Sequence, residues 1–487
     1  MTMTRGMPLS TLVVGFALLL ASPHAVQAGE APQAQSDVGI DIEYERYTLD
    51  NGLEVILHRD PTVPLVNVNL WYHVGSGDEV VGKSGFAHLF EHMMFQGAKH
   101  IGEDVHFDIL REIGGTGVNG TTNSDRTNYF ETVPSHEIET ALWLESDRMG
   151  YMLDLLNEKS LANQIDVVRN ERRQRYDNVP YGAERFAVHA ALYPEGHPYR
   201  YLTIGKHEDL ENASVEDVRA FFQKWYVPSN ATLVIAGDIE LDDAKALVQK
   251  WFGAFPKLPK PEHVAVPAPT LAADVTVEVE DGFARLPRMH WVWHSPAMLA
   301  EGDLELDVVA AALGSAGWGR LYQRLVVEEK IAQSVWLMQD GSGFSGAFHI
   351  NVMLMPGKAD ELAKNRATAG RIIDEEIAKI IAEGPTKAEI DRHVIGVESG
   401  FVWGLESLGS RVNQLQHFNH YTGDPGYSAE YLRRLRAVTP QSVKQAAATY
   451  LSKPKAKIFT RPVPPESKQE GKGKAKAEVT SKKGGQQ

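Results

Sequence analysis

The stretch Gly85-Phe86-Ala87-His88-Leu89-Phe90-Glu91-His92-Met93-Met94-Phe95 decides how this chain is interpreted. Apolar residues surround its polar ones at helical spacing, which predicts a packed helix. His88 and His92 are four residues apart, so both imidazoles lie on one helical face about one turn apart. Two such imidazoles can bind one zinc ion, and Glu91 between them is a candidate general base. The stretch therefore predicts a zinc site with hydrolytic chemistry.

A catalytic zinc site needs a third protein ligand, because such sites use three side chains and a water molecule. The best candidate is Glu171, in Val167-Val168-Arg169-Asn170-Glu171-Arg172-Arg173, on a second predicted helix. A carboxylate ligand leaves the zinc cationic enough to activate its bound water. We expect one Zn²⁺ per chain, bound by His88, His92 and Glu171.

The length, charge and cysteine content of the chain exclude several classes of protein. The chain has 487 residues, which is too long for one ordinary core and indicates two or more domains. A formal net charge of −15 argues against nucleic-acid binding, which needs clustered Lys and Arg. The chain contains 0 Cys, so any metal site must be built from His, Asp and Glu.

The N-terminus carries the pattern of a secretory signal peptide. Arg5 precedes the apolar run 12–21, and Val26-Gln27-Ala28 offers small residues for cleavage. The run is too short to span a bilayer comfortably, although an uncleaved anchor is the alternative interpretation. We therefore predict a signal peptide over 1–28, a disordered leader over 29–40, periplasmic localisation and no stable membrane span after processing.

The next part of the chain alternates between strand and helix patterns. Segments 44–49 and 53–57 flank Asp50-Asn51-Gly52, a strong hairpin signal. Further strands are predicted over 66–74, 129–133 and 231–236, and helices over 137–156, 160–176 and 242–252. These elements define a predicted first domain over 41–255.

A proline-rich linker is predicted over 256–270, and a fainter copy of the same element order follows it. Strands are expected over 289–293 and 348–355, and helices over 304–313, 319–330 and 359–383. We predict a second domain over 271–455 and a flexible tail rich in Lys, Pro and Gly over 456–487. The fold class is α+β, with two similar duplicated domains.

The run from Gly85 to Gly97 resembles the signature of the pitrilysin/insulinase zinc peptidases, especially their shorter, two-domain, processing-peptidase-like subunits. The runs 178–182, 197–199 and 226–233 add to the resemblance, which covers about residues 42 to 455. It implies two α/β-roll domains, with antiparallel-rich sheets packed against helices, that form one half of a clamshell. It also implies zinc ligation by His88, His92 and Glu171, with Glu91 as the base. The peptide would add a strand at a sheet edge, beside Gly117, Asn119, Gly120 and Thr121.

The chain departs from this family at two places. Gln164 stands seven residues before Glu171, where family members often carry an acidic residue, so its support of the metal site is in doubt. Val326 and Gln333 stand where self-sufficient members carry an Arg and a Tyr that help to bind substrate. We therefore predict a second homologous subunit that supplies this Arg/Tyr pair, with a homodimer as the alternative.

Two other functions compete with an exported zinc metalloendopeptidase that cleaves extended or unfolded peptides. The segment 77–84 matches a P-loop between a strand and a helix, although Asp78 and Glu79 would repel phosphates. A non-enzymatic scaffold subunit of the same fold is the other alternative. The presence of His88, Glu91, His92 and Glu171 argues against it.

Overall fold

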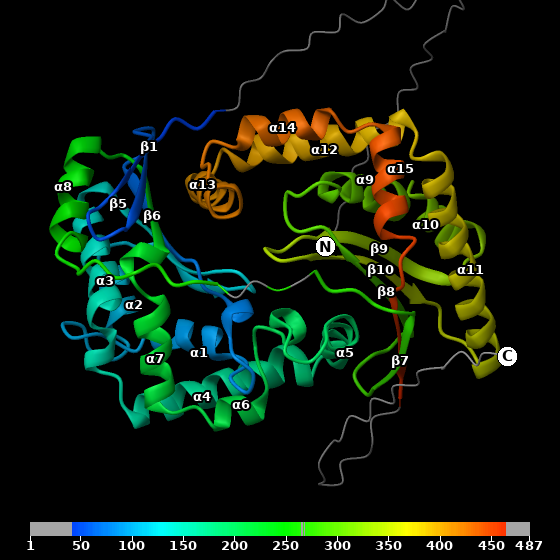
Figure 1. The fold of residues 1–487 in the computed structure, drawn as a ribbon, viewed down its shortest axis with the longest axis horizontal. Helices are drawn as coiled ribbons and strands as arrows, with labels where there is room; N and C mark the ends of the chain where they lie inside the picture. The colour runs from blue at the N-terminus through cyan, green and yellow to red at the C-terminus, as the bar shows by residue number, and fades with distance from the viewer. Residues whose placement is uncertain (1–40, 264–265, 267, 464–487) are drawn as a thin grey trace, which may run out of the picture. The chain divides into compact units, whose positions relative to one another are not determined.

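The computed structural model describes residues 41–263, 266 and 268–463 (Figure 1). The predicted signal peptide and leader therefore lie outside the described residues. Two β-sheets, each packed against helices, occupy the first and second halves of the described chain. Among the described residues, no helix combines the length and apolarity that crossing a membrane requires.

The first sheet has the strand order β1-β2-β6-β3-β5-β4. Its strands are β1 (Glu45–Thr48), β2 (Glu54–Arg59), β3 (Leu65–Tyr72), β4 (Thr116–Thr122), β5 (Thr127–Pro134) and β6 (Ala231–Gly237). The strands β1 and β2 form the hairpin expected around Gly52, which has a φ of 95°. β2 and β6 pair in parallel, and the other neighbours are antiparallel. β4 is therefore an edge strand.

The helices of the first half are α1 (Phe86–Met93), α2 (Val105–Glu112), α3 (Ile138–Tyr151), α4 (Glu158–Arg172), α5 (Gly182–Leu192), α6 (His207–Glu211), α7 (Val215–Trp225) and α8 (Leu241–Phe252). A π-helical turn, Arg173–Asp177, extends α4. Buried side chains from α1, α3, α4, α7 and α8 share one core with alternate residues of β2, β3 and β6. This core fixes α1 and α4, the two helices on which the metal ligands were predicted.

The second sheet has the order β7-β11-β8-β10-β9. Its strands are β7 (Val275–Asp281), β8 (Arg288–Ser295), β9 (Ala332–Asp340), β10 (Gly346–Leu354) and β11 (Ala456–Pro462). The helices are α9 (Asp303–Gly314), α10 (Arg320–Tyr322), α11 (Ala359–Glu383), α12 (Lys387–Gly404), α13 (Leu408–Thr422), α14 (Ser428–Arg436) and α15 (Pro440–Tyr450), with a π-helical turn at Gln323–Glu328. β7 and β11 pair in parallel, as β2 and β6 do in the first sheet, and the other neighbours are antiparallel.

The two sheets share one topology. Strands β2, β6, β3, β5 and β4 of the first sheet correspond in order and direction to β7, β11, β8, β10 and β9 of the second. The predicted α+β fold with a duplicated domain is confirmed. β1 has no counterpart, so the outer edge of β7 carries no partner strand within the described chain.

The predicted boundary at 455 is too early. Residues 456–462 form β11, which lies between β7 and β8 and has buried Ala456, Ile458 and Thr460. Lys457, Thr460 and Arg461 interrupt the apolar pattern and made this strand resemble the start of the polar tail. The ordered second half therefore includes β11, and the remainder of the predicted tail lies outside the described residues.

Each half lends one helix to the other half's sheet. Helix α13 packs on β3 and β6, where Val412 and Leu415 join Ile56 and Val234 in a buried cluster. Helix α5 packs on β7, β8 and β11, where the buried Glu184 accepts hydrogen bonds from Arg288 and His290. Both sheets are therefore covered on two faces, one by their own helices and one by a helix of the other half.

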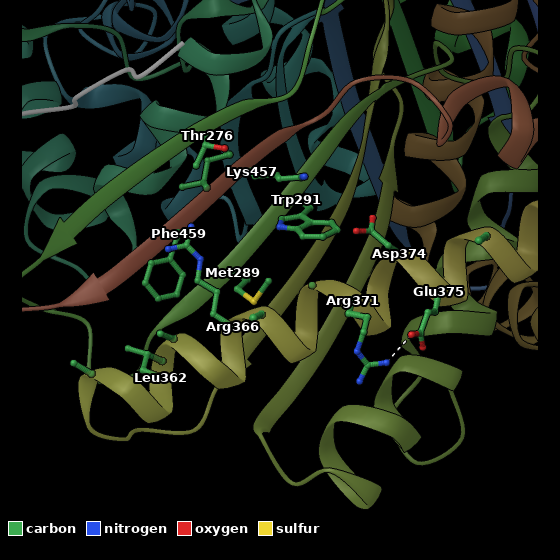
Figure 2. Close-up of a pocket in the computed structure, with 16 residues that line it drawn as sticks. Thr276, Met289, Trp291, Leu362, Arg366, Arg371, Asp374, Glu375, Lys457 and Phe459 are labelled. Carbon is green, nitrogen blue, oxygen red and sulfur yellow. Dashed lines mark hydrogen bonds and ion pairs between the residues drawn. The ribbon is translucent and has the colours of Figure 1, made fainter. Parts of the chain in front are cut away.

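A groove of about 990 Å³ lies between α11 and the strands β7, β8 and β11 (Figure 2). Met289, Trp291 and Phe459 provide its apolar part, and the Arg366 guanidinium lies 4.0 Å from the centre of the Phe459 ring. No histidine lines this groove. It is therefore separate from the predicted metal site.

Candidate metal centre

Helix α1 begins at a position that only glycine occupies without strain. Gly85 has a φ of 89°, and a Cβ there would lie 2.9 Å from the Cα of Gly205. The partly buried Glu79 carboxylate accepts hydrogen bonds from the backbone N–H groups of Gly85 (3.0 Å) and Ala87 (2.8 Å). The free N–H groups at the start of α1 are thus taken by an acidic side chain.

This contact argues against the P-loop alternative. A P-loop holds phosphate with the N–H groups at the start of the following helix, and here Glu79 occupies them. The lysine of the pattern, Lys83, forms an ion pair with Asp217 at 2.6 Å. The segment 77–84 therefore anchors α1 and leaves no free anion site.

The structure brings His88, His92 and Glu171 together. The Glu171 Oε2 atom lies 3.5 Å from His88 Nε2 and 3.3 Å from His92 Nε2. Ligand atoms bound tetrahedrally to zinc at about 2.0–2.1 Å stand about 3.3–3.4 Å apart. Glu171 Oε2 thus stands at close to this separation from each imidazole nitrogen, and the three donor atoms all lie within 4.8 Å of one another, so the residues fit that metal.

The protonation of the imidazoles also suits a metal. Burial, and then the neighbouring His92, lower the pKa of His88 to about 4. His88 is consequently neutral at neutral pH, with a ring lone pair available for a metal. His92 Nδ1 lies 3.3 Å from Gln164 Oε1, so an Nδ1–H would donate to this amide and leave Nε2 free.

Gln164 therefore contacts the site despite its departure from the family pattern. Its amide oxygen accepts the hydrogen bond that a carboxylate would accept at this position. Gln164 lacks the negative charge of the acidic residue that the family often has here. It still makes the contact with His92 that such a residue would make.

Glu91 lies on the same helix and is only 9% exposed. Its Oε2 accepts a hydrogen bond of 2.5 Å from Thr122 Oγ1 at the end of β4. Burial raises the pKa of the Glu91 carboxyl, which makes the carboxylate a stronger base. The Thr122 hydroxyl fixes the orientation of that carboxylate.

Glu91 and the three candidate ligands line one cavity of about 470 Å³. A Cβ at Gly120 would lie 3.1 Å from Glu91 Cγ, so a side chain there would press on the base. The other lining residues are Phe95, Gln96, Phe107, Asn119, Thr121, Thr122, Gln164 and Arg175. Three of the four predicted substrate-binding residues thus border the cavity.

The fourth, Gly117, is not among the lining residues. It has a φ of 63° in the irregular part of β4, where the pairing with β5 shifts between Thr116 and Asn119. Val326 and Gln333, which mark the second departure from the family, lie in the π-helical turn of the second half and on β9. Neither lines the cavity.

The sequence did not predict a second cluster, His106, Glu131 and Glu145, whose donor atoms lie within 4.8 Å of one another. Arg148 donates to both oxygens of Glu145, while neither oxygen of Glu131 has a partner among the described residues. Burial and the nearby Glu145 raise the pKa of Glu131 well above its usual range. A protonated Glu131 beside the Glu145–Arg148 pair is neutral, so the cluster needs no cation.

Two family descriptions match the chain. "Insulinase (Peptidase family M16)" matches residues 54–200, which include all four predicted metal and catalytic residues. "Peptidase M16 inactive domain" matches residues 212–397. Fold and site together define a metallopeptidase-type protein, and the chain belongs to the M16 family, which includes the pitrilysin/insulinase peptidases. The resemblance seen in the sequence is confirmed.

Among its relatives, the zinc protease PqqE of Helicobacter pylori is 29% identical over 407 residues, which cover 80% of this chain and 85% of that protein. A protease structure from Helicobacter pylori has a TM-score of 0.76 and 26% identity, and covers 87% of this chain and 100% of that one. The periplasmic protease PqqL of Escherichia coli shares the fold, with a TM-score of 0.71 and 18% identity. The match covers 86% of this chain and 48% of PqqL.

Proposed function

We propose that this chain is an exported zinc metalloendopeptidase subunit that hydrolyses peptide bonds in extended or unfolded peptides. One observation carries the proposal. The donor atoms of His88, His92 and Glu171 lie within 4.8 Å of one another, and they share a cavity with the buried carboxylate of Glu91.

Zinc at this site would supply Lewis acidity and lower the pKa of a bound water to about 7. Glu91 accepts a proton from the attacking water and returns it to the leaving amine. Thr122 holds the Glu91 carboxylate in place through its hydroxyl. The free edge of β4 offers backbone N–H and C=O groups to an extended peptide, which explains a preference for unfolded chains.

A second homologous subunit completes the enzyme in this proposal. Val326 and Gln333 lack the hydrogen-bonding groups of an Arg/Tyr pair, so another chain supplies them. The match to about half the length of PqqL supports this arrangement, because that protein has room for two such units. A homodimer of this chain is the alternative assembly. Export and periplasmic localisation are proposed from the pattern of residues 1–28.

The scaffold alternative gains little from the "inactive domain" match. That match covers residues 212–397 and contains none of His88, Glu91, His92 or Glu171. It therefore describes mainly the half of the chain in which no metal ligands were predicted.

The proposal is tested by metal analysis and peptide cleavage together. Purified chain should contain one zinc, and His88→Ala or His92→Ala should lose it. Chelation should abolish cleavage of an unfolded polypeptide, and zinc should restore it. The assay is run with the lone chain and after addition of an exported relative that carries Arg and Tyr. Cleavage that is indifferent to chelation and to both histidine variants would overturn the proposal.

A further inference from the structure

Arg175 stands at the rim of the metal cavity. It lies in the π-helical turn Arg173–Asp177 that directly follows the helix of Glu171. Such turns frequently occur at functional sites. Its side chain is 72% exposed, and it is the only Lys or Arg among the residues that line the cavity. Arg175 therefore gives the cavity one permanently charged cationic side chain, which is exposed to solvent.

The one ion-pair partner of Arg175 in the described chain is Glu171. Arg175 Nη1 lies 2.7 Å from Glu171 Oε1, while Oε2 of the same carboxylate faces His88 and His92. When Glu171 binds a metal ion, its negative charge is shared with that ion, so it neutralises less of the positive charge of the Arg175 guanidinium. The exposed guanidinium keeps further N–H donors, and a guanidinium binds carboxylates through two parallel hydrogen bonds.

The surroundings of Arg175 are also basic. Five arginines lie between positions 169 and 185, and two of them, Arg173 and Arg185, form no ion pair within the described residues. The nearby acidic side chains are engaged, since Asp177 pairs with Arg172 and Glu184 with Arg288. In a chain with a net charge of −15, this is a local reversal of sign that would attract anionic segments.

We propose that Arg175 binds a carboxylate of the substrate close to the scissile bond, so that acidic peptides are the preferred substrates of this site. The inference rests on the proposed peptidase function and adds a substrate class to it. The carboxylate belongs either to an Asp or Glu side chain or to a free C-terminus, and both present the same chemistry to Arg175.

The test uses the full chain with its zinc and, if activity requires it, the partner subunit. Two extended fluorogenic peptides differ only by Glu or Gln at one position, which is moved residue by residue along the peptide. At the best position we expect kcat/KM for the Glu peptide to be about fivefold higher, because Arg175 is largely exposed. Arg175→Gln should reduce this ratio to about one, and Arg175→Lys should retain part of it.

Arg173→Gln is the matched control, because Arg173 lies in the same turn but does not line the cavity. It should keep the wild-type ratio. An unchanged ratio in Arg175→Gln would overturn the inference, and so would loss of its zinc, which would assign Arg175 to holding Glu171. C-terminal amidation of the peptides distinguishes the two possible carboxylates. If the Glu/Gln ratio of kcat/KM persists after amidation, Arg175 binds the side-chain carboxylate.

A binding assay separates this inference from the proposed function. Zinc-loaded Glu91→Gln is titrated with the labelled Glu and Gln peptides, and fluorescence anisotropy gives the two Kd values. A preference of about fivefold that disappears in Glu91→Gln/Arg175→Gln supports the role of Arg175 even if no peptide is cleaved. Equal Kd values alongside active wild-type enzyme would overturn the role and leave the peptidase intact.

Discussion

The two halves of the molecule have one strand order but different chemistry. Helices α1 and α9 both begin after a glycine in the left-handed region, Gly85 (φ 89°) and Gly302 (φ 94°). Aligned at these glycines, His88, Glu91 and His92 correspond to Glu305, Val308 and Val309. The two halves therefore share a fold, while the candidate metal ligands all lie in the first half.

The helices that follow show the same divergence. Asn157 and Thr386 cap α4 and α12 with the same capping-box contacts, and α4 and α12 contact α1 and α9 respectively. Aligned at these caps, Glu171 corresponds to Gly400, where a Cβ would meet nothing within 4 Å. Both helices keep the side that packs against the preceding helix, α1 or α9. They differ on the side that carries Glu171, the candidate third ligand, in α4.

Within the described residues, the second half contains no counterpart of α8. In the first half, Glu139 of α3 pairs with Lys250 of α8, and Gly150 lies against Phe255, which follows α8. The positions 220 residues later, Ala359 and Gly370, line the groove shown in Figure 2. The groove is therefore the place that α8 fills in the first half.

The largest effect expected on this comparison is that of Glu91→Gln. Loss of the base should lower kcat about 10²–10⁴-fold while zinc remains bound, because the ligands are untouched. Glu305→Gln in the second half should leave kcat and the zinc content unchanged. Steady-state kinetics measure kcat, and elemental analysis measures the zinc content. Cleavage by Glu91→Gln at near the wild-type rate would exclude Glu91 as the base.

The next effect concerns stability. Phe252→Ala in α8 should lower the free energy of unfolding by about 3–5 kcal/mol, because Phe252 is fully buried in the first core. Leu362→Ala, which only widens the groove of the second half, should cost less than about 1 kcal/mol. Urea unfolding measures both. Equal losses would mean that the groove is packed as tightly as the place of α8.

A smaller effect is expected for zinc affinity. Gln164→Ala removes the acceptor next to His92 Nδ1, so the Kd for zinc should rise about 10–100-fold. Gln164→Glu should restore wild-type affinity or better. The counterpart in the second half, His393→Ala, should have no effect. Competition with a chelator gives these values, and wild-type affinity in Gln164→Ala would remove Gln164 from the site.

The last expected effect is a pH dependence of stability that comes from one side chain of the second half. Asp307, which corresponds to Phe90 of α1, has a pKa raised to about 8 by burial and then by Asp303. The folded chain thus keeps a proton that the unfolded chain releases near pH 4. The unfolding free energy should then fall as pH rises from about 4 to 8, by at most about 1.4 kcal/mol per pH unit. Asp307→Asn should flatten this slope, as measured by urea unfolding at several pH values; an unchanged slope would contradict the assignment.

Local patterns in the sequence predicted much of this molecule. Helical spacing identified α1, α4 and α11, and the repeated order of elements predicted the shared topology. Strand β9 was missed because both of its faces are partly exposed, so its residues do not alternate. β11 was missed because charged residues interrupt it.

Contacts between distant segments could not be predicted in the same way. The sequence identified His88, Glu91, His92 and Glu171, since their chemistry and spacing are local or shared with a family. It gave no sign that Glu79 caps α1, and it marked the place of Gln164 only through the family pattern, without showing that its amide reaches His92. The contacts of Glu79 with α1 and of Gln164 with His92 depend on how loops and helices meet in space, whereas the pair between Arg175 and Glu171 is local.

The exchange of α5 and α13 between the halves has a consequence for dissecting the protein. A cut in the connector 256–270 would leave each fragment with an uncovered sheet face: β3 and β6 without α13, and β7, β8 and β11 without α5. Each fragment should aggregate when it is expressed alone, because an apolar sheet face is exposed. When both fragments are co-expressed, they should be recovered as a folded complex. The two halves therefore need each other to cover their sheets, but they do not need to be joined by one connector.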